Sequence, residues 1–303
     1  MVDVNYAKSI PLRLPYIDCT ALRSIEPIEL RYLTATSWPK PIVAAQHDVS
    51  HVPDLVLAQW QAAQYVSKQL QDKGILAIDA SAKSGLDATL FAKYRSGSRP
   101  FSPLPSTLVP LCYTVLHQSC HRVMFGDEGA IRLPRLYSVV ARRMLLMSAD
   151  AINDLLAAAK AQQKVYEAQT PVLYPNTPRR SINTIVRERM TDILCDSGHQ
   201  TLSFFGRDTP EGVKNNIRTY FDDSYKRTKP HLLFLMYMAF ETGMALDFFI
   251  AENFCQYVPC YYHDNGHDVL VDDQRVLDYI GICASLPPEN RITLFADALS
   301  RSF

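Results

Sequence analysis

Residues 255–268 read Cys-Gln-Tyr-Val-Pro-Cys-Tyr-Tyr-His-Asp-Asn-Gly-His-Asp, and they contain two thiols, two imidazoles and two carboxylates. Near the end of this stretch lies Asn265-Gly266, a dipeptide typical of two-residue β-hairpin turns, because both turn positions require a positive φ. The flanking residues are rich in Tyr and Val, which favour strands. The sequence therefore predicts a small β-hairpin over residues 256–271.

The hairpin would separate the reactive side chains. Side chains alternate between the two faces of a strand. With Asn265-Gly266 as the loop, this alternation gives two groups: Cys260, Tyr262, Asp264 and His267 on one face, and Tyr261, His263 and Asp268 on the other. The spacing Cys-x4-Cys-x2-His-x3-His suggests zinc, but one tetrahedral ion cannot collect ligands from both faces. The hairpin therefore argues against a zinc site.

The His-Asp-x-Gly-His pattern at residues 263–267 is similar to the central signature of HD-domain phosphohydrolases. The resemblance covers five to six residues. In that family an adjacent His-Asp pair ligates a metal ion. The resemblance implies a metal-dependent phosphohydrolase in which His263 and Asp264 bind the metal, with His231 and His267 as further candidate ligands. This activity is the alternative to the function inferred below.

The composition and hydrophobic spacing predict a mainly α, multi-helix globular protein. Of the 303 residues, 48% are hydrophobic and 20% charged, which is typical of a folded chain. Apolar residues at helical spacing, with Pro and Gly as boundaries, predict helices over residues 54–73, 86–95, 107–125, 133–147, 148–168, 178–196, 209–227, 230–254 (with a break at Gly243), 272–284 and 288–300. Ser148 is the predicted cap of the helix over residues 148–168, and Thr177 that of the helix over residues 178–196. The longest apolar run, residues 231–240, is too short for a membrane span.

Prolines divide the predicted helices into two domains. Residues 1–53 are expected to form an irregular, Pro-rich, extended arm, because prolines recur throughout them. Residues 54–170 form a predicted helical N-terminal domain. Residues 171–178 contain three prolines, and we predict that they form a stiff linker. Residues 179–303 form a predicted helical C-terminal domain that includes the hairpin.

Charge is balanced overall but unevenly distributed. The formal net charge is zero, which makes a nucleic-acid partner unlikely on electrostatic grounds. Residues 231–303 hold three basic and ten acidic residues, a balance of −7. Such a region can steer a basic partner, dock on a basic surface of the same chain, or form a solvated acidic face. Seven scattered cysteines and no recognisable secretory leader predict reduced thiols and a cytoplasmic location.

Motifs for catalysis are sparse. We find no Gly-rich phosphate loop, Gly-x-Ser-x-Gly or dinucleotide fingerprint, and we expect no cofactor. His117 and His121 lie four residues apart in a predicted helix and are interpreted as packed or partly exposed side chains. The sequence therefore favours a non-enzymatic interaction or adaptor protein, an accessory subunit of a larger complex.

The extended arm over residues 1–53 and the hairpin are the predicted contact elements of the protein. Its partners would be proteins, including proteins with basic surfaces, because sheet edges pair with extended segments and aromatic residues anchor interfaces. The candidate partner-binding residues are Tyr257, Tyr261, Tyr262, Asn265 and Gly266.

Overall fold

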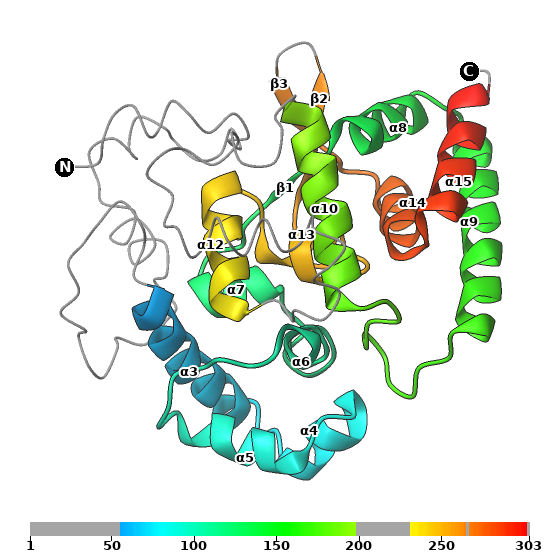
Figure 1. The fold of residues 1–303 in the computed structure, drawn as a ribbon. Coiled ribbons are helices and arrows are strands. Elements are labelled where there is room, and N and C mark those ends of the chain that lie inside the picture. The colour runs from blue at the N-terminus through cyan, green and yellow to red at the C-terminus, as the bar shows by residue number, and fades with distance from the viewer. Residues whose placement is uncertain (1–54, 198–230, 265–266, 302–303) are drawn as a thin grey trace, which may run out of the picture.

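A computed structural model of the chain describes residues 55–197, 231–264 and 267–301 (Figure 1). Over these residues the protein is mainly helical, with one small three-stranded sheet. The predicted fold class is therefore confirmed. The predicted arm over residues 1–53 and the predicted helix over residues 209–227 lie outside the described residues.

The first part of the described chain forms helices with short connections. In order they are α3 (Leu55–Asp72), α4 (Ala77–Ser84), α5 (Ala88–Ser96), α6 (Pro105–Val109), the π-helix η2 (Pro110–Leu116), α7 (Cys120–Phe125), α8 (Arg135–Leu145) and α9 (Ala149–Gln169). The predicted cap of α9 is confirmed, because the Ser148 side chain accepts a hydrogen bond from the backbone N–H of Ala151. Helix α4 was not predicted.

The second part contributes five helices within the described ranges. They are α10 (Ile182–Ser197), α12 (Leu232–Thr242), α13 (Leu246–Ile250), α14 (Gln274–Ser285) and α15 (Pro288–Ser300). The predicted break at Gly243 is confirmed, since this residue ends α12 in the left-handed conformation with φ of 65°. No helix in the described ranges is long and apolar enough to cross a membrane.

The predicted continuous helix over residues 107–125 was wrong. At Pro110 the α-helix α6 gives way to the wider turns of η2, which ends where His117 adopts a positive φ of 55°. A new helix, α7, then begins, and the Ser119 side chain caps it by accepting from the N–H of Arg122. His117 and His121 therefore do not share a helix face.

The predicted start of the helix over residues 178–196 was also wrong. Helix α10 begins at Ile182, not at Pro178. The Ser181 hydroxyl accepts a hydrogen bond from the N–H of Thr184, so Ser181 takes the capping role that the sequence suggested for Thr177.

The sheet consists of β1 (Ile131–Arg132), β2 (Cys260–Asp264) and β3 (His267–Leu270), in the order β1-β2-β3. Strands β2 and β3 are antiparallel, with Asp264 opposite His267 and His263 opposite Asp268. This is the register that Asn265-Gly266 predicts. Strand β1, which runs parallel to β2, was not predicted.

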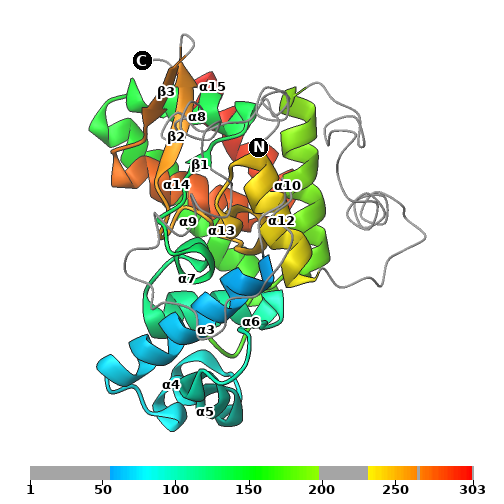
Figure 2. The ribbon, with the colours of Figure 1, turned by 90° about the vertical axis from the view of Figure 1, so that its left-hand side faces the viewer.

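The helices pack around one contiguous apolar core that draws residues from α3 to α15. Helices α3, α4 and α5 lie at the end of the molecule opposite the β2–β3 hairpin (Figures 1 and 2). Helix α9 packs against α14 and α15, and α8 packs against β2, α14 and α15. These contacts join elements from both predicted helical domains, and the division into two domains stays a prediction.

The predicted linker lies against the first part of the chain. The side-chain amide of Asn176 donates to the Thr114 hydroxyl at 3.0 Å. The ring of Tyr174 covers Gly85, the left-handed residue that ends α4 with φ of 71°. A methyl group at Gly85 would overlap this ring.

Two glycine substitutions test this packing. Gly74 also has a positive φ, of 61°, but a methyl group there meets nothing within 4 Å. Gly74→Ala should therefore lower the free energy of unfolding by about 1 kcal/mol, the cost of backbone conformation. Gly85→Ala adds the clash with Tyr174 and should lower the free energy of unfolding by about 2–3 kcal/mol. Urea titrations measure both changes. Equal losses for the two variants would contradict this placement of the linker.

Candidate functional site

The tyrosines predicted to contact a partner are partly buried within the fold. The Tyr257 hydroxyl donates to the backbone carbonyl of Tyr113 at 3.3 Å, and the two rings meet edge to face, 4.9 Å apart. Tyr262 is half-buried and packs against the core, and Tyr261 is also half-buried. The other two candidates, Asn265 and Gly266, lie outside the described residues. Tyr257 therefore fixes the base of the hairpin.

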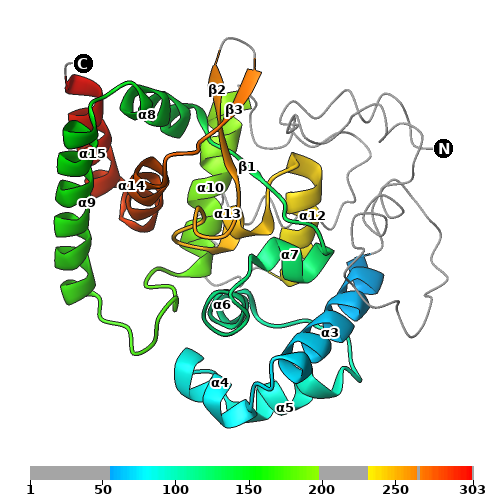
Figure 3. The same ribbon diagram turned by 180° about the vertical axis from the view of Figure 1, so that it is seen from behind.

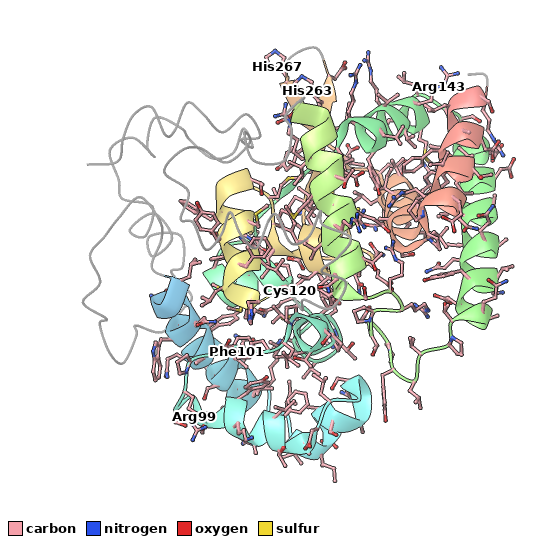
Figure 4. All side chains as sticks on the ribbon, in the orientation of Figure 1. Arg99, Phe101, Cys120, Arg143, His263 and His267 are labelled. Carbon is pink, nitrogen blue, oxygen red and sulfur yellow. The ribbon has the colours of Figure 1, made fainter. Side chains whose placement is uncertain are left out.

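The candidate metal ligands do not converge. Figure 4 shows His263 and His267 toward the outer end of the hairpin, and the register puts their side chains on opposite faces. The Asp264 carboxylate is bound by Arg142 at 3.0 Å, and His231 is an exposed residue at the start of α12. Within residues 55–197, 231–264 and 267–301, no three His, Cys, Asp or Glu side chains are placed to hold a metal ion.

His263 instead belongs to a charge cluster with Arg132 and Asp268. Its Nδ1 atom lies 2.9 Å from the Asp268 carboxylate and 3.0 Å from Nη2 of Arg132. Nε of Arg132 lies 3.1 Å from the same carboxylate, which is nearly covered. Strand β1 thus attaches its arginine to both strands of the hairpin.

Acidic residues of the C-terminal region therefore pair with basic residues from earlier in the chain. Asp268 pairs with Arg132 and Asp264 with Arg142. Glu252 accepts from the backbone N–H of Arg180 at 2.9 Å and lies 3.4 Å from its Nε. Of the three possibilities that the sequence left open, docking on a basic surface of the same chain is the one observed for these three acids.

The β2 edge of the hairpin is hydrogen-bonded to other parts of the fold. The backbone N–H groups of Ile131 and Leu133 donate to the carbonyls of Pro259 and Tyr261, at 2.9 and 2.8 Å. Further along the strand, the N–H of His263 donates to the Ser138 hydroxyl of α8 at 3.2 Å. The outward groups of β2 are therefore satisfied by β1 and α8.

The outer edge of β3 has no such strand partner in the part of the chain that the structure describes. The N–H of Val271 donates to the carbonyl of Cys260 at 2.9 Å, so Val271 faces β2. Hydrogen-bonding direction alternates along an antiparallel strand, so Val269 also faces β2. The N–H and C=O groups of Asp268 and Leu270 then point away from the sheet. In the part of the chain that the structure describes, no strand pairs with this side of β3.

Apolar side chains flank this edge. Val269 is 38% exposed and Leu270 is 47% exposed, on opposite faces of β3. Strands β2 and β3 lie at one end of the molecule, near α8 (Figures 1 and 3). We call the outward backbone groups of Asp268 and Leu270, together with the Val269 and Leu270 side chains, the β3 edge.

A buried carboxylate forms a second polar centre, which the sequence analysis did not identify. Asp247 of α13 is fully buried and accepts from the Tyr113 hydroxyl at 2.8 Å. It also accepts from the N–H groups of Cys120 and His121, at 2.8 and 2.9 Å, where α7 begins. The signal that could have identified it is the lone Asp within the apolar segment Leu246–Ile250. Asp247 therefore joins η2, α7 and α13 structurally.

His121 lies beside this carboxylate and is packed, as predicted. Its Nδ1 accepts from the N–H of Leu246 at 3.1 Å, and its Nε2 lies 2.8 Å from the Asp127 carboxylate. Both ring nitrogens therefore have partners within the fold.

Five of the cysteines are buried thiols. Cys112, Cys120, Cys255, Cys260 and Cys283 are all free. Burial raises the pKa of Cys112 and Cys120 above the ordinary thiol value, and raises the pKa of Cys283 to about 12. The thiolate is the nucleophilic form, so these three side chains are inert near neutral pH.

Comparison with protein-family models, with curated proteins and with solved structures found no match to this chain. The function is therefore argued from the site geometry.

Substitution of Asp247 tests the buried centre. In Asp247→Asn an NH2 group replaces one of the two acceptor oxygens. This NH2 group would face the hydroxyl and backbone N–H groups that donate to the carboxylate in the wild-type protein. We expect the free energy of unfolding to fall by about 2–3 kcal/mol. Asp150→Asn, at an exposed acid in the first turn of α9, should cost less than about 1 kcal/mol. Chemical denaturation checks both variants, and an Asp247→Asn protein as stable as Asp150→Asn would refute the role of this carboxylate.

Proposed function

We propose that the protein is a non-enzymatic interaction or adaptor protein, an accessory subunit of a larger complex, that binds an extended segment of a protein partner along the β3 edge. The observation that carries the proposal is the outward-facing backbone of Asp268 and Leu270, flanked by exposed aliphatic side chains. An incoming strand would satisfy these backbone groups and cover Val269 and Leu270.

The sequence of β3 lacks the usual protection against strand addition. Exposed edges are commonly guarded by Lys, Pro or inward-pointing charges. Residues 267–271 read His-Asp-Val-Leu-Val, without Lys, Arg or Pro. The one acid among them, Asp268, is paired with Arg132 and His263. An approaching strand would therefore meet little electrostatic repulsion.

The hairpin is also held in place before a partner arrives. Strand β1 and Ser138 satisfy one side of β2, and Arg142 binds Asp264 at the end of β2. Ordering a loop on binding costs free energy, which a preorganised element avoids. This rigidity supports a docking role for β3.

A backbone substitution tests the proposal. The N–H of Leu270 points outward, so Leu270→Pro removes a donor from the β3 edge and leaves the ladder with β2 intact. Leu270→Val keeps the N–H and is the matched control. We expect Leu270→Pro to reduce, by more than about tenfold, the capture of other polypeptides from native lysate, because strand addition depends on these hydrogen bonds. Leu270→Val should capture as the wild type does, measured by quantitative mass spectrometry.

Circular dichroism and thermal unfolding of both variants check that the fold is retained. Deleting residues 256–271 would not serve, because Val258 and Cys260 are buried in the core. Identical capture by the wild-type, Leu270→Pro and Leu270→Val proteins would remove the β3 edge from the proposal.

A further inference from the structure

We propose that Ser98 is a phosphorylation site. Its hydroxyl takes the γ-phosphoryl group of ATP in the active site of an arginine-directed protein kinase, and Arg95 and Arg99 then bind the phosphate. Ser98 lies in the loop between α5 and α6, at the end of the molecule opposite the β2–β3 hairpin (Figure 1). Figure 4 shows Arg99 at the same end. The site shares no residue with the β3 edge, so either proposal can hold without the other.

Hydrogen bonding distinguishes Ser98 from the neighbouring Ser96. The Ser96 hydroxyl donates its one proton to the carbonyl of Lys93 at 2.7 Å and accepts from the N–H of Ser98 at 3.4 Å. In the 2.9 Å contact between the two hydroxyls, Ser98 is therefore the donor. No group in the described part of the chain donates to the Ser98 oxygen. The lone pairs of this oxygen are thus available for attack on phosphorus.

Exposure distinguishes Ser98 from a second serine of the loop, Ser102. A kinase binds several consecutive residues of its substrate, so the acceptor must lie in an accessible run. Five of the six residues from 95 to 100 are exposed. Ser102 is itself exposed, but its two neighbours, Phe101 and Pro103, are buried. The accessible run therefore contains Ser98 and ends before Ser102.

The cations beside Ser98 are placed to bind a phosphate. Arg95 precedes the serine by three residues and Arg99 follows it directly. Both side chains are exposed, and neither takes part in an ion pair within the described ranges. Residues 88–126 contain no Asp or Glu that would repel the phosphate. Arg95 also complements the negative end of α5, but this effect fades beyond the last turn, and Arg99 lies past the Gly97 cap.

The charge of the loop identifies the class of kinase. Two arginines around the acceptor fit a substrate cleft lined by acidic side chains. In the transfer, the Ser98 oxygen attacks the γ-phosphorus of ATP, the bond from this phosphorus to the β-phosphate oxygen breaks, and ADP leaves. An aspartate of the kinase takes the hydroxyl proton. The product is a phosphate ester beside two guanidinium groups, which form strong charge-assisted hydrogen bonds with phosphate.

Phosphorylation of the full chain tests the acceptor. The protein is incubated with Mg-ATP and an arginine-directed serine kinase, and tandem mass spectrometry locates the phosphate. We expect the segment 88–106 to gain about 80 Da, the mass that one phosphoryl group adds. Ser98→Ala should abolish this gain. Ser102→Ala is the matched control and should be modified as the wild type is, because Ser102 also follows an arginine by three residues.

An acid-directed serine kinase is the second control. It should leave the segment 88–106 unmodified, because this segment contains no acid for it to recognise. Absence of phosphate from the segment, its placement on Ser102, or equal modification by the two kinases would overturn the assignment of Ser98. Circular dichroism of both alanine variants should match the wild type, since both serines are exposed.

The binding of the phosphate by arginine has its own readout. The second pKa of a phosphoserine is about 6. Neighbouring guanidinium groups favour the dianion and lower this pKa. The C-terminal end of α5 opposes them with only about half a charge. In phosphorus NMR titrations, the phosphate pKa of the modified wild type should therefore lie below that of modified Arg99→Gln, which keeps Arg95 for the kinase.

Lys83→Gln is the matched control for loss of one positive charge, because Lys83 is an exposed cation of α4. Its phosphate pKa should equal that of the modified wild type. The same phosphate pKa in the wild type, Arg99→Gln and Lys83→Gln would show that Arg99 does not bind the phosphate and would overturn that part of the proposal.

Discussion

The buried guanidinium of Arg189 holds together segments that lie far apart in the sequence. This α10 side chain is fully buried and donates to the Tyr137 hydroxyl of α8 at 2.9 Å and to the Ala284 carbonyl of α14 at 3.0 Å. Arg291 of α15 donates to the same hydroxyl. A buried charge is tolerated only when it is paired and hydrogen-bonded. The positions of four helices are therefore coupled to one side chain, and the sheet is built against this assembly through α8.

The hairpin depends on the same kind of pairing. Asp264 and Asp268 belong to the acidic C-terminal region, and they are bound by arginines from β1 and α8. Part of the charge asymmetry along the sequence is thus an internal complementarity between the two halves of the chain. The contacts that neutralise Asp268 also leave β3 without an effective guard against strand addition, which links the stability of the hairpin to its proposed role.

Local chemistry explains what the sequence could predict. The Asn265-Gly266 dipeptide predicts the observed β2–β3 register, Ser148 caps α9 and Gly243 ends α12, and each signal is local in the sequence. What the sequence missed depends on distant partners. Strand β1 has two residues and exists because β2 lies beside it, and an arginine such as Arg189 is usually exposed. At the candidate site, the sequence predicts the hairpin and which side chains share each of its faces. It does not predict that β1 and Ser138 form hydrogen bonds with the outward backbone groups of β2.

Strand addition at β3 requires that the outer side of this strand be free in the monomer. Residue-resolved amide exchange by NMR, on dilute protein, measures this directly. The N–H of Val269 faces β2 and should exchange at least about tenfold more slowly than the N–H of Leu270, which faces outward. Equal protection of Leu270 and Val269 in the dilute protein would show that the edge is already occupied, and would contradict strand addition at β3.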